Sequence, residues 1–163
     1  MHILGRSIKE VNIIGGTPGA TSVYPNPAWA IKNGFARNIP TGWHNYHPYG
    51  DLPEMIWYKF RRGFVPAEVS FQPRADNAKY VFQGPNVYQF VGTNDHHCNA
   101  HSTWTVLCED LSGYPFRHPT DVKRCVVRSN IKKRFSCLGL RIWKSGHTSA
   151  ISLSNIRMWK KIN

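Results

Sequence analysis

Acidic residues are scarce in this chain. Its 163 residues include nine Asp and Glu against 21 Lys and Arg, which gives a formal net charge of +12. Two close carboxylate pairs exist, Asp51 with Glu54 and Glu109 with Asp110, but neither has a surrounding motif for glycoside hydrolysis. The cationic excess attracts anionic partners, and the alternative is a charge that serves solubility alone.

Enzyme motifs and membrane segments are also missing from the sequence. It contains no G-x-S-x-G, H-E-x-x-H, P-loop or G-x-G-x-x-G pattern. No apolar run approaches the roughly 20 residues that cross a bilayer, and the first residues lack the basic and apolar parts of a signal peptide. With no repeat or linker, we predict one non-catalytic domain over residues 1–163 that is not transmembrane.

Four cysteines allow three disulfide pairings. Sequence order favours Cys98–Cys108 and Cys125–Cys137, each closing a loop of roughly ten residues. The alternative is a zinc site that combines Cys98 with nearby histidines, namely His96, His97 and His101. Because no C-x-x-C pair occurs, we favour disulfides and therefore expect an extracellular or cell-surface protein.

The secondary structure is predicted to be short strands. The 13 Gly and 11 Pro are spread along the chain and suit turns better than long helices. The exception is Asn26–Gly34, where proline at the start and glycine at the end suit a helical turn. A change of phase at Ser154–Asn155 predicts a bulge. The expected strands are Met55–Phe60, Ala67–Gln72, Asn86–Gly92, Thr103–Cys108, Arg134–Lys144 and Ala150–Lys160. Regular spacing of such strands indicates an antiparallel sandwich.

A polar loop interrupts the segment from Tyr88 to Asp110. Gly92–Asn94 breaks the first strand, and Asp95 and His96 follow in a stretch unsuited to a core. A polar loop on a rigid β scaffold is a common place for recognition residues. We therefore include Asp95 and His96 among the candidate ligand-binding residues.

The order of these segments resembles the discoidin, or coagulation factor 5/8 type C, family. The resemblance runs from about Ala20 to Trp159 and consists of eight pieces in the family's order: Ala20–Ser22, Pro27–Gly34, Thr41–His44, Pro53–Phe60, Pro66–Arg74, Tyr88–Asp95, Leu138–Ile142 and Ser152–Trp159. The resemblance implies an all-β, antiparallel jelly-roll sandwich. It also implies a binding module whose loops at one end contact galactose-type sugars, anionic phospholipid, collagen or other proteins. The fold does not decide among these ligands.

A galactose-type glycan or glycoprotein is the first partner that we expect. A sugar needs an aromatic face and fixed hydrogen-bonding groups, and the loop Trp43–Tyr49 contains both. The resemblance matches Trp43-His44 to a W-H-T sugar motif, from which Asn45 departs, and Arg74 and Asn77 to further sugar contacts. It takes the stacking aromatic from the loop before the last strand, where only His147 has a ring. The predicted ligand-binding residues are His44, Asn45, Tyr46, His47, Tyr49, Arg74, Asn77, Asp95, His96 and His147.

Structural roles are the alternatives for three of these positions. Trp43 is of a type that is usually buried in the core. His44 could hydrogen-bond a neighbouring carbonyl, and Arg74 could pair with Asp76 or Asp51 without consequence for binding.

The resemblance also implies a structural calcium, held by backbone carbonyls and two carboxylates. Here Asn33 and Asn155 occupy the two carboxylate positions. Because calcium prefers charged oxygen ligands, we expect no calcium and no other metal or cofactor.

Basic residues form three groups along the chain: Lys59, Arg61 and Arg62; Lys123, Arg124, Arg128, Lys132, Lys133 and Arg134; and Arg157, Lys160 and Lys161. In the middle group, Arg128, Lys132, Lys133 and Arg134 are predicted to bind anions. A disulfide between Cys125 and Cys137 would hold this group together. The second hypothesis is therefore an adhesion module for a polyanion, anionic lipid or acidic protein. Nucleic acid is not expected, because no aromatic residues interleave with these cations.

Overall fold

The computed structural model describes residues 7–46, 53–146 and 150–162. Three of the predicted ligand-binding residues, His47, Tyr49 and His147, lie outside these ranges. Among the described residues, no helix is long and apolar enough to cross a membrane.

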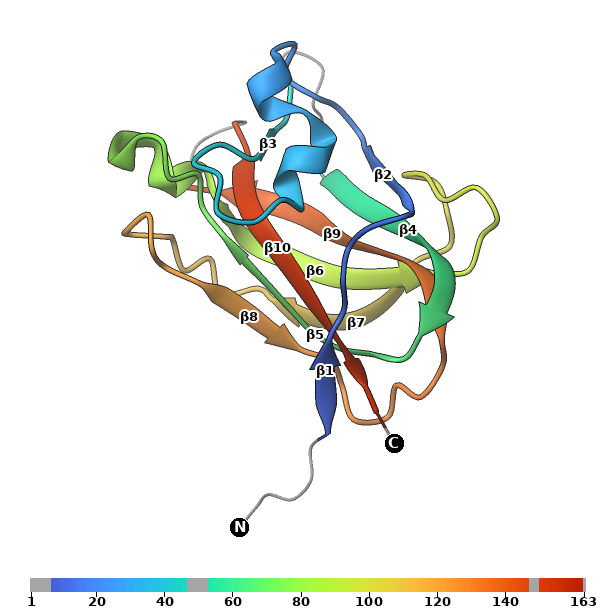
Figure 1. The fold of residues 1–163 in the computed structure, drawn as a ribbon. Helices are drawn as coiled ribbons and strands as arrows, with labels where there is room; N and C mark the ends of the chain where they lie inside the picture. The colour runs from blue at the N-terminus through green and yellow to red at the C-terminus, as the bar shows by residue number, and fades with distance from the viewer. Residues whose placement is uncertain (1–6, 47–52, 147–149, 163) are drawn as a thin grey trace.

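Two antiparallel sheets form the body of the molecule (Figure 1). One has the order β1-β10-β5-β8, with β3 also paired to β10, and the other has the order β2-β4-β9-β6-β7. The first sheet comprises β1 (Ile8–Glu10), β3 (Trp43–His44), β5 (Pro66–Gln72), β8 (Lys123–Val126) and β10 (Ser152–Lys161). The second comprises β2 (Thr17–Ala20), β4 (Glu54–Phe64), β6 (Pro85–Thr93), β7 (Thr105–Asp110) and β9 (Phe135–Ser145). The predicted all-β, antiparallel jelly-roll sandwich is confirmed.

The core lies between the two sheets. Phe71 of β5 packs edge-on against Tyr88 of β6, with ring centroids 4.9 Å apart, and both side chains are fully buried. In β10, Leu153 and Ile156 are both buried. They are three residues apart, and in a regular strand such a spacing would place them on opposite faces. The register of β10 against β5 shifts between Ser154 and Arg157, which confirms the predicted bulge.

The six predicted strands are all present, and the predicted helical turn is present as two short 3-10 helices, η1 (Pro27–Trp29) and η2 (Ile31–Gly34). Asn26 caps η1 by accepting a hydrogen bond from the Ala28 amide. Strand β4 continues beyond its predicted end at Phe60 to Phe64, and Arg61 and Arg62 in this extension are exposed. A third 3-10 helix, η3 (Ala78–Gln83), was not predicted.

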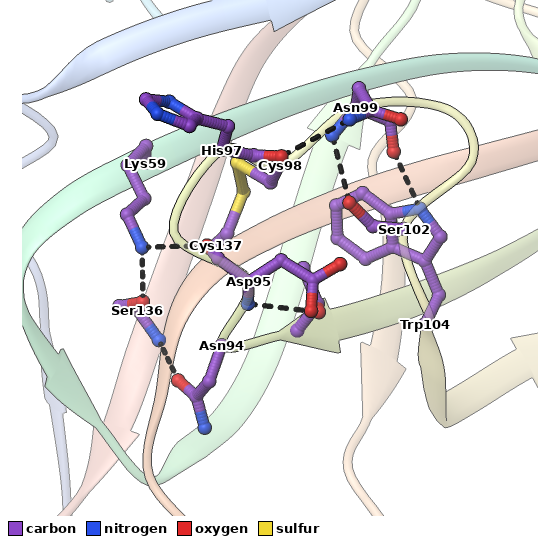
Figure 2. Close-up of a disulfide and its surroundings, with 11 residues drawn as sticks. Lys59, Asn94, Asp95, His97, Cys98, Asn99, Ser102, Trp104, Ser136 and Cys137 are labelled. Atoms are coloured by element: carbon purple, nitrogen blue, oxygen red, sulfur yellow. Dashed lines mark hydrogen bonds between the residues drawn. A yellow bond between two sulfur atoms is a disulfide. The ribbon is translucent and has the colours of Figure 1, made fainter.

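Both disulfides exist, but the expected pairing is wrong. Cys98 is joined to Cys137 and Cys108 to Cys125 (Figure 2 shows the first). Cys137 of β9 lies beside Thr93 at the end of β6, so the loop that follows β6 returns over it. Cys108 and Cys125 belong to β7 and β8, the edge strands of different sheets, and their bond links the two sheets. The zinc alternative fails because Cys98 is in a disulfide.

The barrel has two poles. At the His44 pole lie β3, the starts of β4, β6 and β10, and the end of β5. At the opposite pole β4 and β10 end and β5 and β9 begin. Strand β1 pairs with the end of β10, with Ile8 opposite Lys161, so β1 also lies at that opposite pole (Figure 1).

Candidate functional site

Strand β3 fixes the position of the predicted tryptophan–histidine motif. Trp43 and His44 pair with Leu153 and Ser152 of β10. A Cβ atom on Gly42 would lie 2.0 Å from the Leu153 carbonyl oxygen, so a glycine is required for this close approach. Trp43 is fully buried, and its indole Nε1 donates to the Ser22 carbonyl at 2.9 Å. Trp43 is therefore a core residue, and His44 is the first residue of the motif that can belong to a site.

His44 lies among aromatic rings. Its ring centroid is 5.2 Å from that of Tyr24 and 5.6 Å from that of Trp29. Nδ1 lies 2.6 Å from the Asn45 carbonyl oxygen and must donate to it, as the structural alternative predicted. In the neutral ring this makes Nε2 an acceptor.

Arg74 follows β5 and is held on two sides of its guanidinium group. Nε and Nη2 each donate to the Asp76 carboxylate at 2.7 Å, and Nη1 donates to Gln83 Oε1 at 3.1 Å. The group stacks 4.3 Å from the ring centroid of Trp29 and 4.8 Å from that of Tyr80. The hydrogen bond from Arg74 holds the pKa of Asp76 below its usual value, despite the opposing effect of partial burial. The pairing predicted between Arg74 and Asp76 is confirmed.

Trp29 connects His44 with Arg74. One ring of η1 thus contacts the histidine edge-on and the guanidinium face-on, so the two predicted residues lie at the same pole. Three of the five N–H groups of Arg74 have partners among the described residues, which leaves two for a ligand. Tyr24 is 39% exposed and adds an aromatic face beside His44. The cluster therefore combines an aromatic surface with a histidine ring and charged donors.

Three other predicted residues support this pole. Asn45 is fully buried; its side chain donates to Glu54 at 3.1 Å and accepts from the Ile151 amide at 2.9 Å. Asn45 therefore links the end of β3 to Glu54 of β4 and to Ile151, which precedes β10. Tyr46 is half-buried and packs edge-on against Tyr24, with centroids 6.2 Å apart. Asn77 caps η3 by accepting from the Lys79 amide at 3.0 Å.

Asp95 and His96 lie at the far end of β6 from Gln83. Strand β6 spans nine residues, and at about 3.3 Å per residue it separates these two loops by more than about 25 Å. Lys59 donates to the Asp95 carbonyl at 3.1 Å, and the Asn94 side chain accepts from the Ser136 amide at 2.9 Å (Figure 2). The structure thus separates Asp95 and His96 from the His44 cluster, because the loop is fastened to β4 and β9.

Four residues of the cluster were absent from the sequence-based set: Tyr24, Trp29, Tyr80 and Gln83. Tyr80 and Gln83 belong to η3, which was not predicted, and Trp29 was assigned only to a helical turn. The sequence signal that could have predicted η3 is Asn77, because asparagine is a favoured N-cap residue and here precedes a turn that contains Tyr80 and Phe82.

The predicted anion-binding residues have different surroundings in the structure. Arg128 pairs with Glu109 at 3.4 Å, and Lys133 lies over the Phe135 ring. Lys132 and Arg134 instead line a cavity of about 1180 Å³ at the opposite pole. The expected Cys125–Cys137 bond, which was to hold these cations together, does not exist.

The residues at the implied calcium position do not fit that ion. The Asn33 side-chain amide donates to the carbonyl oxygens of Pro27 and Ala28, at 3.2 and 3.0 Å. Asn155 donates to Gln72. Over the described ranges, no group of three His, Cys, Asp or Glu residues is arranged to hold a metal. The two carbonyl oxygens beside Asn33 therefore already accept hydrogen bonds from its amide.

The architecture is that of F5/8 type C domains and family 32 carbohydrate-binding modules, which confirms the resemblance in fold. The galactose complex of the family 32 module of Clostridium perfringens NanJ is similar at 14% identity and a TM-score of 0.70, over 94% of this chain and 100% of the module. An F5/8 type C domain from Bacteroides fragilis has 9% identity and a TM-score of 0.71, over 96% and 98%. Chitosan-binding module 1 of a Paenibacillus enzyme has 13% identity and a TM-score of 0.66, over 90% and 96%. No protein-family model and no curated protein matches the sequence.

Proposed function

We propose that this protein is a non-catalytic carbohydrate-binding module whose site is the cluster around His44 and Arg74. The observation that carries the proposal is the contact of Trp29 with both residues, beside the exposed ring of Tyr24. Binding sites for small polar ligands combine an apolar surface with a few fixed polar groups. This cluster has both.

The proposed ligand is a galactose-type glycan. The C–H face of the sugar packs on Tyr24, its hydroxyls contact the ring of His44, and they accept from the remaining N–H groups of Arg74. Charged donors make the stronger kind of hydrogen bond. Structural neighbours determined with galactose and with GalNAc-β-1,3-galactose support the choice of sugar class.

The proposed location is the cell exterior or surface. Two disulfides are suited to an oxidising compartment and are rare in the cytosol. A glycan-binding module there would act in adhesion to glycoproteins.

Titration calorimetry with galactose tests the site. We expect Arg74→Ala and His44→Ala each to weaken binding at least about tenfold, because each leaves sugar hydroxyls without a partner. Arg74→Lys keeps the charge but loses the planar fork, and should also weaken binding. Circular dichroism checks that each variant is folded.

The matched control is Arg61→Ala, which removes one arginine at the opposite pole. Galactose affinity that is unchanged in both Arg74→Ala and His44→Ala would contradict the site. A glycan array at low and high salt tests the ligand class, since binding to a neutral sugar should survive high salt. If only chitooligosaccharides bind, the proposed carbohydrate-binding function stands and the proposed galactose-type ligand is wrong.

A further inference from the structure

A hollow lies at the pole opposite His44, about 30 Å away along the ten residues of β10. Its volume of about 1180 Å³ is at or above the upper end of the roughly 300–1,000 Å³ typical of ligand pockets. The walls come from β1, from the end of β4, from the start of β5, from residues 127–134 between β8 and β9, and from the end of β10. These strands are distant in sequence, so the hollow is a product of the fold.

The charged residues that line this hollow are all cationic. They come from all three basic groups of the sequence: Arg61, Arg62, Lys132, Arg134, Lys160 and Lys161. No Asp or Glu is among the described lining residues. Each of the five ion pairs found in the described ranges uses an arginine elsewhere. Lys161 donates to the carbonyls of Arg128 and Ile131, whereas the other five cations have no carboxylate partner among the described residues. The hollow therefore attracts an anion.

The floor of the hollow is apolar. Phe60, Phe64, Ala67 and Val127 line it, and all four are buried. Ile8, Ile14 and Ile162 stand at its edge with exposed fractions of 36%, 76% and 43%. Exposed aliphatic side chains gathered around a concave surface are typical of a binding site. A purely ionic ligand, such as a sulfated glycan, would leave this surface unused.

We infer that the hollow binds a single-chain anionic amphiphile, with its acyl chain on the apolar floor and its head among the cations. The concave shape takes in one molecule, whereas a bilayer presents a flat surface. A fatty acid and a monoacyl phospholipid share this chemistry and differ in the head group. This inference does not depend on the proposed sugar site.

Calorimetry with dodecanoate and dodecyl phosphate, both below their micelle concentrations, tests the inference. Either probe should bind, and the tighter one identifies the head group. Inorganic phosphate and dodecyltrimethylammonium should bind at least about tenfold more weakly, because the first lacks the chain and the second has the wrong charge. Galactose should not compete.

Two pairs of variants separate the cavity from general electrostatics. Lys132→Ser with Lys160→Ser removes two lining cations, and Lys9→Ser with Lys144→Ser removes two exposed cations that do not line the hollow. We expect at least about tenfold weaker dodecanoate binding in the first pair and less than twofold change in the second. Ile14→Ser should weaken dodecanoate without affecting phosphate.

Three results would overturn the inference. The first is an absence of binding of both dodecyl probes to the wild-type protein. The second is an equal loss in the two lysine pairs, which would indicate diffuse attraction. The third is a heparin fragment or phosphate that binds as tightly as dodecanoate, which would make the hollow a simple polyanion site.

Discussion

The Asn33 side chain joins two 3-10 helices through its amide group. In the implied calcium position its amide donates to the carbonyls of Pro27 and Ala28 and so holds η1 against η2. A carboxylate would face the same carbonyls without a proton to donate. The local structure is therefore closed by hydrogen bonds within the chain.

We predict that EDTA leaves the melting temperature of the wild-type protein unchanged. In Asn33→Asp, the loss of these hydrogen bonds should reduce the free energy of unfolding by about 1 kcal/mol in EDTA. Thermal unfolding followed by circular dichroism measures both effects. A drop in the wild-type melting temperature on chelation would show that the amide does not replace an ion.

Arg74 shows what could and could not be predicted at the scale of residues. The resemblance predicted both Arg74, which follows a strand, and His44, which follows Trp43, as sugar contacts. The structure places these two residues at one pole. Tyr24 and Tyr80 were missed because tertiary packing, which no local pattern records, brings them there. Asp95 and His96 were grouped with the site although successive loops of an antiparallel sheet alternate between its two ends.

Strand β1 is attached to the rest of the sheet by one carboxylate as well as by its backbone. Glu10 accepts from Nη2 of Arg157 on β10 at 2.6 Å and also pairs with Arg37. The hydrogen bond from Arg157 is the main reason that the pKa of Glu10 lies below its usual value of 4.5, with burial opposing the shift. Because Ile8 of β1 lines the basic hollow, this attachment also positions one of its walls.

Glu10 should make stability depend on pH in acid. Its pKa is lower in the folded than in the unfolded state, so its contribution is present above about pH 4.5 and is lost as the pH falls through the folded-state value. We predict that Glu10→Gln lowers the free energy of unfolding by up to about 1 kcal/mol at neutral pH, since the pair is partly exposed. Urea unfolding across pH should show the two proteins converging in acid. A constant difference down to the lowest pH would contradict this.

Other elements differ in how well the sequence defines them. Strand β6 contains Val87, Tyr88, Phe90 and Val91, and β5 contains Val69 and Phe71; both strands were predicted nearly to their ends. Strand β2, with the sequence TPGA, has no such signal and forms because β4 supplies its partner. The disulfide pairing depended on register between distant strands, which sequence order does not contain.

The whole molecule is held together at its open edge by the Cys108–Cys125 bond, which links β7 of one sheet to β8 of the other. By the chain-entropy argument, its 17-residue separation corresponds to about 3 kcal/mol. The 39-residue separation of Cys98 and Cys137 corresponds to about 4 kcal/mol. The Cys108–Cys125 bond thus keeps the edges of the two sheets together.

We predict that Cys108→Ala with Cys125→Ala reduces the free energy of unfolding by about 3 kcal/mol, measured with urea. The paired comparison is Cys98→Ala with Cys137→Ala, which should cost somewhat more. Peptide mapping without reduction should recover the Cys98–Cys137 and Cys108–Cys125 links. Recovery of a Cys98–Cys108 peptide would refute the connectivity.

The pairing of Ile8 with Lys161 has a practical meaning for any surface-based assay (Figure 1). A tag fused to the chain beyond β10, which ends at Lys161, attaches the protein to a sensor chip by the pole that contains the basic hollow. Tyr24 and His44 then face the flowing solution, whereas the mouth rimmed by Ile14 is pressed toward the matrix. Immobilised in this way, the protein would expose the proposed sugar site and hinder access to the proposed amphiphile site, so tests of the two proposals need different points of attachment.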